Sequence, residues 1–187
     1  MIDYSHIYLS LIHYPVYDKG RRVITTSVTN LDIHDLARLT RTFGFGGVYL
    51  VQPSRLQREL ARRIIDHWDL GAGGEYNETR KEAFKTVSLV SSIEDMMSDL
   101  SKRVRERVLT IATTARDFPG QESFDRVREE LEGGGPAVVM FGTGWGLSDE
   151  IIATADRVLS PLVISREYNH LSVRCSAAII LDRLAGR

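Results

Sequence analysis

The sequence predicts an α/β fold in which a mostly parallel sheet is flanked by helices. Short apolar segments alternate with longer amphipathic segments along the whole chain, and this alternation is typical of parallel strands joined by helical crossovers. Glycine clusters end several of the amphipathic segments, as expected at helix boundaries. The expected strands lie at approximately residues 6–12, 23–28, 47–51, 86–90, 108–113, 137–141 and 157–159.

The expected helices begin at polar residues that can cap them. Asn30 or Asp32 can cap a helix that runs to Phe43, and Ser92 with Asp95 approximates a capping box for a later helix. A final helix is expected at about residues 172–184, where apolar side chains recur at helical spacing. Those side chains are Val173, Ala177, Ile180, Leu181 and Leu184. This helix must pack against its own sheet or against a second subunit, and the spacing fits both.

Composition limits the classes of protein to consider. The chain has 187 residues, of which 43% are hydrophobic and 26% charged, so we expect a single domain over residues 1–187 with one sizeable core. No apolar run approaches the roughly 20 residues that cross a bilayer, so we expect neither membrane insertion nor export. The single cysteine, Cys175, excludes an internal disulfide or a cysteine-based zinc site, and it favours a reducing cytoplasm.

The net charge of −1 lacks the basic signature of many nucleic-acid-binding proteins, so any such binding must come from local clusters. A cluster of this kind is also compatible with an ordinary solvated face. The clusters are Arg21 and Arg22, Arg38 and Arg41, Arg55, Arg58, Arg62 and Arg63, and Arg103, Arg105 and Arg107.

The densest chemical signal is the run Phe-Gly-Thr-Gly-Trp-Gly-Leu-Ser, which follows an expected strand and leads into a helix capped by Ser148. Gly142, Gly144 and Gly146 permit positive φ angles and close backbone approach, so amide groups can converge on a small-molecule ligand. The spacing differs from Gly-x-Gly-x-x-Gly and comes late in the chain, which argues against a dinucleotide site. A tight turn without a ligand also collects glycines, and this alternative stays open.

Two further segments carry polar groups. After an expected short strand at 160–164, Asn169, His170 and Arg174 gather at the start of the final helix, where backbone N–H groups point outward. In the segment 30–44, Arg38 and Arg41 share a helix face, a geometry suited to gripping phosphates. A capped helix start and an exposed helix face would look the same.

These three segments, in this order, resemble the three motifs of the SPOUT methyltransferases, and the similarity covers most of the chain. Arg38 stands at the position of the family's catalytic arginine, with a Phe-Gly closing its helix as in the family. The glycine run resembles the second motif, but it lacks the glutamate that many relatives place between the first two glycines. The third motif reads Leu-Ser-Val-Arg in place of Leu-Asn-Val-Ser, and this stretch resembles a little-characterised group of predicted SPOUT RNA methyltransferases. A Thr-Thr-Ala-Arg turn at Thr113 is similar to one in some ribose methylators.

The resemblance implies a cytoplasmic enzyme that uses S-adenosylmethionine to methylate tRNA or rRNA, on the base or on the ribose 2′-hydroxyl, without a metal. It implies a trefoil knot in the last third of the chain and a homodimer with the cofactor pocket beside the interface. Arg38 would hold the acceptor, and His170 would be the base, with Glu167 and Tyr168 as alternatives. The implied cofactor-binding residues are Thr113, Gly142, Thr143, Gly144, Gly146, Leu147, Leu162, Ile164, Tyr168, Asn169 and Leu171.

Two other classes of function are compatible with the same residues. A nucleotide-binding regulatory protein without turnover would use the glycine loop to grip a phosphate. An RNA-binding pseudoenzyme would keep the knot and have lost methyl transfer. Binding of S-adenosylmethionine separates the first from an enzyme, and methyl incorporation into RNA separates the second.

Overall fold

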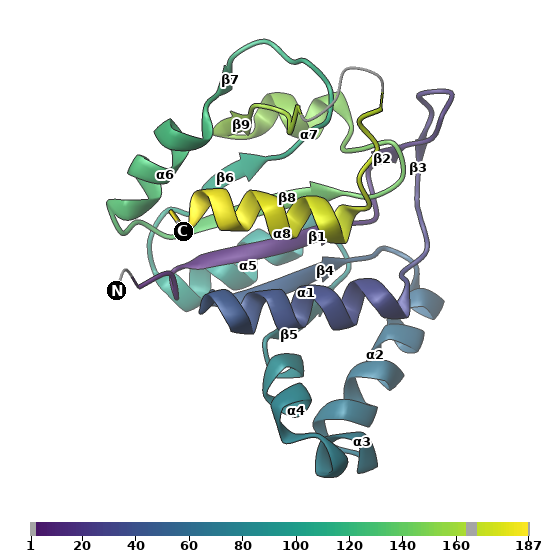
Figure 1. Ribbon diagram of the computed structural model, residues 1–187. Helices are drawn as coiled ribbons and strands as arrows, with labels where there is room; N and C mark the ends of the chain where they lie inside the picture. The colour runs from purple at the N-terminus through teal and green to yellow at the C-terminus, as the bar shows by residue number, and fades with distance from the viewer. Residues whose placement is uncertain (1–2, 164–167, 187) are drawn as a thin grey trace.

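Seven parallel strands form the centre of the computed structural model, which describes residues 3–163 and 168–186 (Figure 1). In spatial order the strands are β5 (Val87–Val90), β4 (Gly47–Val51), β1 (Ile7–Ile12), β8 (Ala137–Gly142), β6 (Leu109–Ala112), β9 (Arg157–Leu159) and β7 (Gln121–Glu122). The expected α/β class and six of the eight expected strands are therefore confirmed. Because every strand runs the same way, all their carboxyl ends lie along one edge of the sheet.

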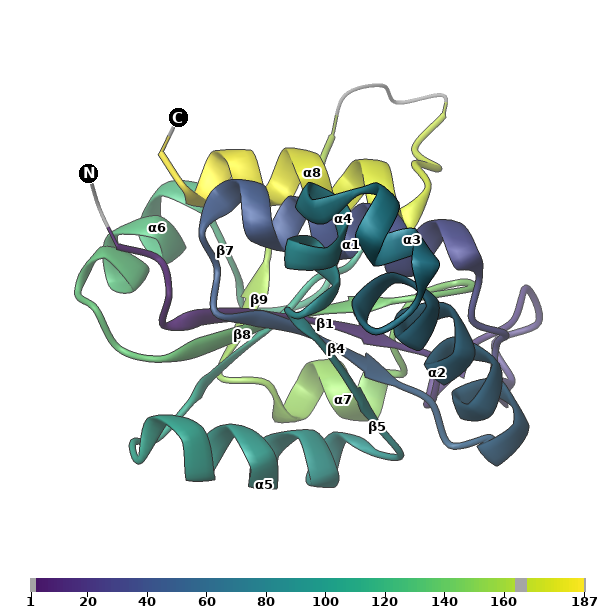
Figure 2. The same ribbon diagram turned by 90° about the horizontal axis from the view of Figure 1, so that it is seen from below.

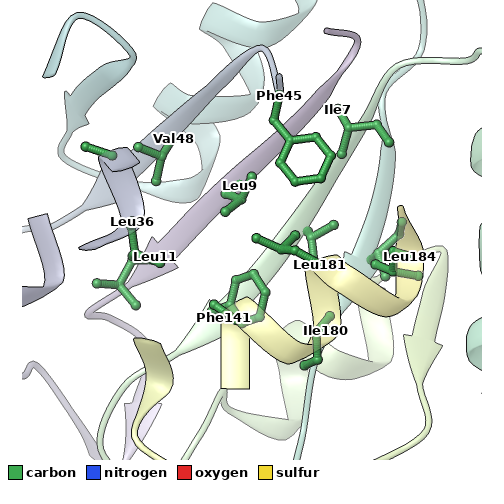
Figure 3. Packing of buried hydrophobic residues seen from close by; sticks show 14 of the residues in the cluster. Ile7, Leu9, Leu11, Leu36, Phe45, Val48, Phe141, Ile180, Leu181 and Leu184 are labelled. Carbon is green, nitrogen blue, oxygen red and sulfur yellow. The ribbon is translucent and has the colours of Figure 1, made fainter. Parts of the chain in front are cut away.

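The central strand β1 is buried on both faces, as a near-continuous apolar sequence predicts for a parallel sheet. Leu9 and Leu11 pack with the helices on one face, whereas Tyr8 and Ile12 pack on the other. Figure 3 shows the first of these two clusters, where side chains of β1, β4 and β8 meet those of two helices.

Helices cover both faces of the sheet (Figure 2). The first face carries α1 (Asn30–Phe43), α6 (Phe124–Glu132) and α8 (Val173–Leu184), and the second carries α5 (Ile93–Val104) and α7 (Asp149–Thr154). Three further helices, α2 (Arg55–Asp69), α3 (Ala72–Tyr76) and α4 (Glu78–Phe84), connect β4 to β5 and project beside the β5 edge (Figure 1).

The helix starts are largely as predicted. Ser92 and Ser148 each accept a hydrogen bond at the N-terminus of a helix, which confirms them as caps, and Ser172 does the same for the final helix. For α1 the prediction of Asn30 or Asp32 is wrong. Its cap is Thr29, whose hydroxyl accepts from the Asp32 amide and donates to the Asp32 carboxylate.

Two strand predictions are also wrong. In place of a strand at 23–28, a short antiparallel hairpin pairs β2 (Val16–Tyr17) with β3 (Val23–Ile24), outside the main sheet. Residues 25–29 leave strand geometry because their polar groups bond inward, as when the Thr26 amide donates to the His13 carbonyl. In the expected strand at 160–164, residues 160–163 are irregular, and Ile164 lies outside the described residues.

The final helix packs against its own sheet. Ala177, Ile180 and Leu184 are buried with β1 and β8 in the cluster of Figure 3. These three side chains are therefore covered within the protomer, and the predicted subunit interface that includes this helix stays a prediction.

Candidate functional site

The predicted cofactor loops lie at the carboxyl edge of the sheet. From β1 the chain first adds β4 and β5 on one side of that strand, and it then adds the later strands, beginning with β6 and β8, on the other side. The direction in which strands are added therefore reverses between β1 and β8. In open parallel sheets, ligands bind beside the carboxyl ends of the strands at such a reversal. The glycine loop, residues 142–147, begins where β8 ends at this point.

Backbone hydrogen bonds hold the glycine loop in one conformation. The Thr143 amide donates to the Ile12 carbonyl at 3.2 Å, and the Trp145 amide donates to the Tyr17 carbonyl at 2.9 Å. The Gly146 amide donates to Thr143 and is therefore used within the loop. The amides of Gly144 and Leu147 have no acceptor in the described part of the chain, so they remain as loop donors for a ligand.

The three glycines are required for different reasons. A Cβ at Gly142 would lie 2.4 Å from the Leu147 amide nitrogen, so that glycine is needed for the loop to fold back on itself. Gly144 has φ +59°, and a Cβ there would lie 2.8 Å from the Tyr17 carbonyl oxygen. Gly146 has φ +95°, but a Cβ there would meet only open space. The open side of the loop is therefore at Gly146.

Side chains of the turn after β6 bond to the chain at the two ends of the glycine loop. Thr113 is buried, and its hydroxyl donates to the Met140 carbonyl of β8. Arg116 donates to the Leu147 carbonyl at 3.1 Å and pairs with Asp149 at 2.9 Å. The Thr-Thr-Ala-Arg turn noted in the sequence thus holds the end of the loop and the start of α7 together.

A chain of hydrogen bonds connects the ends of β1 and β8 through three side chains. His13 Nδ1 lies 3.0 Å from the Thr26 hydroxyl, and Thr26 lies 2.5 Å from the Thr143 hydroxyl, which donates to the Ile12 carbonyl. Since Thr143 uses its proton on Ile12, Thr26 must donate to Thr143, and His13 must donate from Nδ1 to Thr26. This order leaves His13 Nε2 as a buried acceptor, which has no partner among the described residues.

His13 is fully buried, and sequence analysis did not select it. Burial lowers the pKa of His13 from 6.5 to about 4, and the nearby Asp32 carboxylate offsets part of that shift. The imidazole is therefore neutral at physiological pH and serves as a fixed hydrogen-bonding group. A single histidine after an apolar strand gave no signal, because its partners Thr26 and Thr143 are distant in sequence.

The third segment lies beside the glycine loop. The rings of Trp145 and His170 are 6.0 Å apart between centroids, and those of Tyr168 and His170 are 5.3 Å apart. All three rings are exposed, as is Leu171, while Asn169 is partly exposed. Leu162 is buried in the first core cluster. Ile164 and Glu167, which the sequence also selected, lie outside the described residues.

An ion-pair network joins the starts of α8 and α1. Arg174 contacts Asp32 at 3.3 Å and Asp35 at 2.8 Å. These carboxylates raise the pKa of Arg174, and the largest cause is the hydrogen bond that Arg174 donates to Asp35. Arg174 therefore positions the third segment against α1.

Arg38 lies apart from the glycine loop. Its side chain is exposed, and it follows Asn30 by eight residues, which places it about 12 Å along α1 from the carboxyl edge. Arg38 is close enough to His34 to affect its charge. Burial lowers the pKa of His34, Arg80 and Arg38 lower it further, and Asp35 offsets part of the shift. The structure thus brings together the second and third segments, and it places Arg38 further along α1 from the carboxyl edge than the start of that helix.

A cavity of about 490 Å³ opens at the carboxyl ends of β7 and β9. Ser160, Pro161 and Val163 of the third segment form one wall, and the start of α6 forms another. The residues that line this cavity do not include the glycine loop.

A parallel sheet with a glycine loop after β8, and with the polar entry to the last helix beside it, is the arrangement of the SPOUT methyltransferases. Solved structures share the fold. A probable methylase family protein from Haemophilus influenzae gives a TM-score of 0.63 at 18% identity, over 100% of this chain and 66% of that one. The SpoU methyltransferase AviRb from Streptomyces viridochromogenes, solved with AdoMet, gives 0.59 at 14% identity, over 96% of this chain and 59% of that one.

The chain belongs to a family of SAM-dependent RNA methyltransferases, whose sequence model matches residues 6–186. It is 40% identical to a tRNA (guanine-N(1)-)-methyltransferase of Oleidesulfovibrio alaskensis over 97% of its length, but it spans only 42% of that relative. It is 36% identical to an uncharacterized protein of Aquifex aeolicus, covering 98% of this chain and 90% of that one. The predicted family, fold and cofactor are therefore confirmed.

Among the described residues, no helix is long and apolar enough to cross a membrane. The trefoil knot and the roles of the individual site residues stay predictions.

Proposed function

We propose that this chain transfers the methyl group of S-adenosylmethionine to a nucleotide of tRNA. The family match supports methyl transfer to RNA. The name of the Oleidesulfovibrio relative supports tRNA, as does the same name of a relative from Nitratidesulfovibrio vulgaris that is 40% identical over 97% of this chain. The guanine N1 position is not carried over, because more than half of each of those relatives lies outside the matched region. The observation that carries the proposal is the fixed glycine loop with its free Gly144 amide beside the third segment.

The loop fits a cofactor with hydrogen-bond acceptors. Within the described residues it offers amides without an acceptor at Gly144 and Leu147 and an open side at Gly146, while the bonds that loop amides donate to Ile12 and Tyr17 keep that geometry fixed. We propose that Thr113, Gly142, Thr143, Leu147, Leu162, Tyr168, Asn169 and Leu171 complete the binding site, together with Ile164. When bound, S-adenosylmethionine supplies a methyl group already activated on its sulfonium.

The remaining work for the protein is alignment of the acceptor and removal of its proton. His170 stands beside Trp145 at the mouth of the loop, exposed to an incoming nucleotide, so we propose it as the base. Arg38 is proposed to hold the acceptor RNA by its phosphate or ribose. Since Arg38 lies about 12 Å along α1, it would contact RNA that extends beyond the loop.

We further propose that residues 1–187 form one methyltransferase domain, and that two copies form a cytoplasmic homodimer. The dimer proposal rests on the family likeness and on apolar side chains that stay exposed near the site. Val163 is 66% exposed and Leu171 is 43% exposed, so a second subunit would bury apolar area there. Light scattering should give about twice 21.1 kDa at micromolar concentration, whereas a monomer mass would contradict the dimer.

Two measurements test the function. Calorimetry should show binding of S-adenosylmethionine and none of comparable strength for ATP or NAD, whereas preference for ATP would favour the nucleotide-binding regulator. Labelled methyl groups should then enter tRNA. Tight cofactor and tRNA binding without incorporation would instead identify a pseudoenzyme.

A further inference from the structure

A second surface at the carboxyl edge is formed by the first half of α2. There a cavity of about 400 Å³ opens between the helix and the edge strand β5. Its walls consist of Arg55, Arg58, Glu59, Arg62, Arg63 and Leu89. We call its four arginines the α2 arginine face.

The α2 arginine face carries an excess of positive charge that the protein leaves uncompensated. Arg55 pairs with Glu59 at 2.8 Å, and Glu59 is the one carboxylate of the cavity wall. Arg62 and Arg63 are exposed, and neither has an ion-pair partner among the described residues. The whole chain has a net charge of −1, so the positive charge of this face is a local feature and does not reflect a basic protein.

Hydrogen bonds tie this face to the cofactor side of the edge. Arg58 donates to the carbonyls of Gln52 and Pro53, directly after β4. The Gln52 side chain donates to the Thr26 carbonyl at 2.9 Å, and the Thr26 hydroxyl contacts Thr143 of the glycine loop. Gln52 and Thr26 therefore connect Arg58 of the arginine face to Thr143 of the proposed cofactor site.

The spacing of the four arginines suits a linear polyanion. Arg58 follows Arg55 by three residues, Arg62 follows by four more, and Arg63 is next to it, and all four line the same cavity. Eight residues of helix cover about 12 Å, which is longer than a single phosphate requires. Guanidinium groups bind phosphate oxygens in pairs, so such a row fits consecutive phosphates of a nucleic-acid strand.

We propose that the α2 arginine face binds the sugar–phosphate backbone of the RNA substrate and leads it across the carboxyl edge toward the glycine loop. This inference rests on the proposed function, because it takes RNA as the partner. Leu56 and Leu60 are also exposed on α2, so the competing occupant is a protein surface.

The test compares two double variants for tRNA binding over a range of salt concentrations. Arg62→Ala/Arg63→Ala removes two exposed charges from the face. Lys102→Ala/Arg105→Asn removes two exposed charges at the end of α5, on the opposite face and near the amino edge of the sheet. Asparagine is chosen because Arg105 has φ +57°, which asparagine tolerates.

The α2 variant should bind tRNA roughly 10-fold more weakly, with a salt slope lower by about one to two units. S-adenosylmethionine affinity and kcat at saturating tRNA should stay unchanged, so the loss appears in KM. Arg62→Lys/Arg63→Lys should recover most of the salt slope, since the charge is restored. The α5 control should match the wild type.

Equal tRNA affinity and salt slope in the α2 and α5 variants would overturn the proposal. A change in protein mass by light scattering with unchanged tRNA affinity would overturn it too, and would assign α2 to a protein interface. These outcomes are separate from failure of the proposed function, which would appear as wild-type protein that binds tRNA but transfers no methyl group.

Discussion

The glycine loop lies at the carboxyl edge of the sheet and the α2 arginine face begins at that edge, but the two are built in opposite ways. The loop is fixed by backbone bonds to Ile12 and Tyr17, and three of its six residues are glycines without a side chain. The arginine face consists of long exposed side chains, and only Arg58 is tied down by bonds to the backbone. A ligand of one defined shape needs a preorganised site, whereas a polyanion needs charge that can adapt. The difference supports our proposals that the loop binds the cofactor and that the helix binds RNA.

The largest effect is expected from Gly144→Val. A Cβ there would lie 2.8 Å from the Tyr17 carbonyl and the residue would keep φ +59°, so the loop cannot hold its conformation. We expect S-adenosylmethionine binding to become undetectable by calorimetry, with a lower melting temperature.

Gly146→Ala is the matched control for that variant, because its Cβ meets open space and its cost is the left-handed strain of about 1–2 kcal/mol. It should fold and keep the cofactor more tightly than Gly144→Val. Equal binding by Gly144→Val and the wild type would show that the loop does not hold the cofactor.

Arg38→Ala should separate cofactor binding from methyl transfer. Arg38 is exposed on α1 and distant from the loop, so S-adenosylmethionine affinity should stay nearly intact. Methyl transfer to tRNA should fall by roughly 100-fold, equivalent to about 2.7 kcal/mol, because one charged positioning group is lost. Arg41→Ala, on the same helix, should weaken tRNA binding and leave the rate at saturating tRNA close to wild type. Full-speed transfer by Arg38→Ala would remove its proposed role.

His13→Gln should change how stability depends on pH. The pKa of His13 is about 4 in the folded chain and 6.5 in the unfolded chain. Between these two pH values the unfolded chain binds a proton at His13 and the folded chain does not. Folding stability therefore falls as pH drops from 6.5 toward 4. At pH 5 this linkage costs about 2 kcal/mol.

The variant cannot titrate, so it should lose about 2 kcal/mol less than the wild type between pH 7 and pH 5 in urea unfolding. Identical losses in the two proteins would mean that His13 is not held neutral by burial.

Arg116→Ala should have the smallest effect. It removes the bond to the Leu147 carbonyl and one of two partners of Asp149, so the loop end loosens. We expect S-adenosylmethionine to bind roughly 10-fold more weakly, which corresponds to about 1.4 kcal/mol. Arg21→Ala also removes a partner of Asp149 but leaves the carbonyl bonded, so it should bind nearly as the wild type does. If both variants weaken binding equally, Asp149 rather than the loop carbonyl is the important contact.

The sequence predicted those features that depend on neighbours along the chain. The strands at 47–51 and 157–159, the capped starts of α5 and α7, and the glycine loop all follow from local periodicity and capping chemistry. The hairpin of β2 and β3 was missed because its two-residue strands are too short to show alternation. Thr29 was missed as a cap because Asn30 and Asp32 are equally good caps by type.

The site was predictable only in part, since its contacts join residues distant in sequence. The glycine loop was visible because three glycines stand within five residues. The hydrogen-bonded chain from His13 through Thr26 to Thr143 spans more than a hundred residues and left no local pattern. The burial of Ile180 in its own protomer was likewise undecided, because an apolar stripe specifies a contact but not the partner.

Mass spectrometry of the modified nucleosides in RNA tests the central claim most directly. RNA is compared from cells with this gene, without it, and without it but supplied with the wild type or Gly144→Val. We expect one methylated nucleoside of tRNA to disappear with the gene, to return with the wild type, and to stay absent with Gly144→Val. An unchanged set of methylated nucleosides, or full restoration by Gly144→Val, would contradict methyl transfer from a cofactor held by the glycine loop.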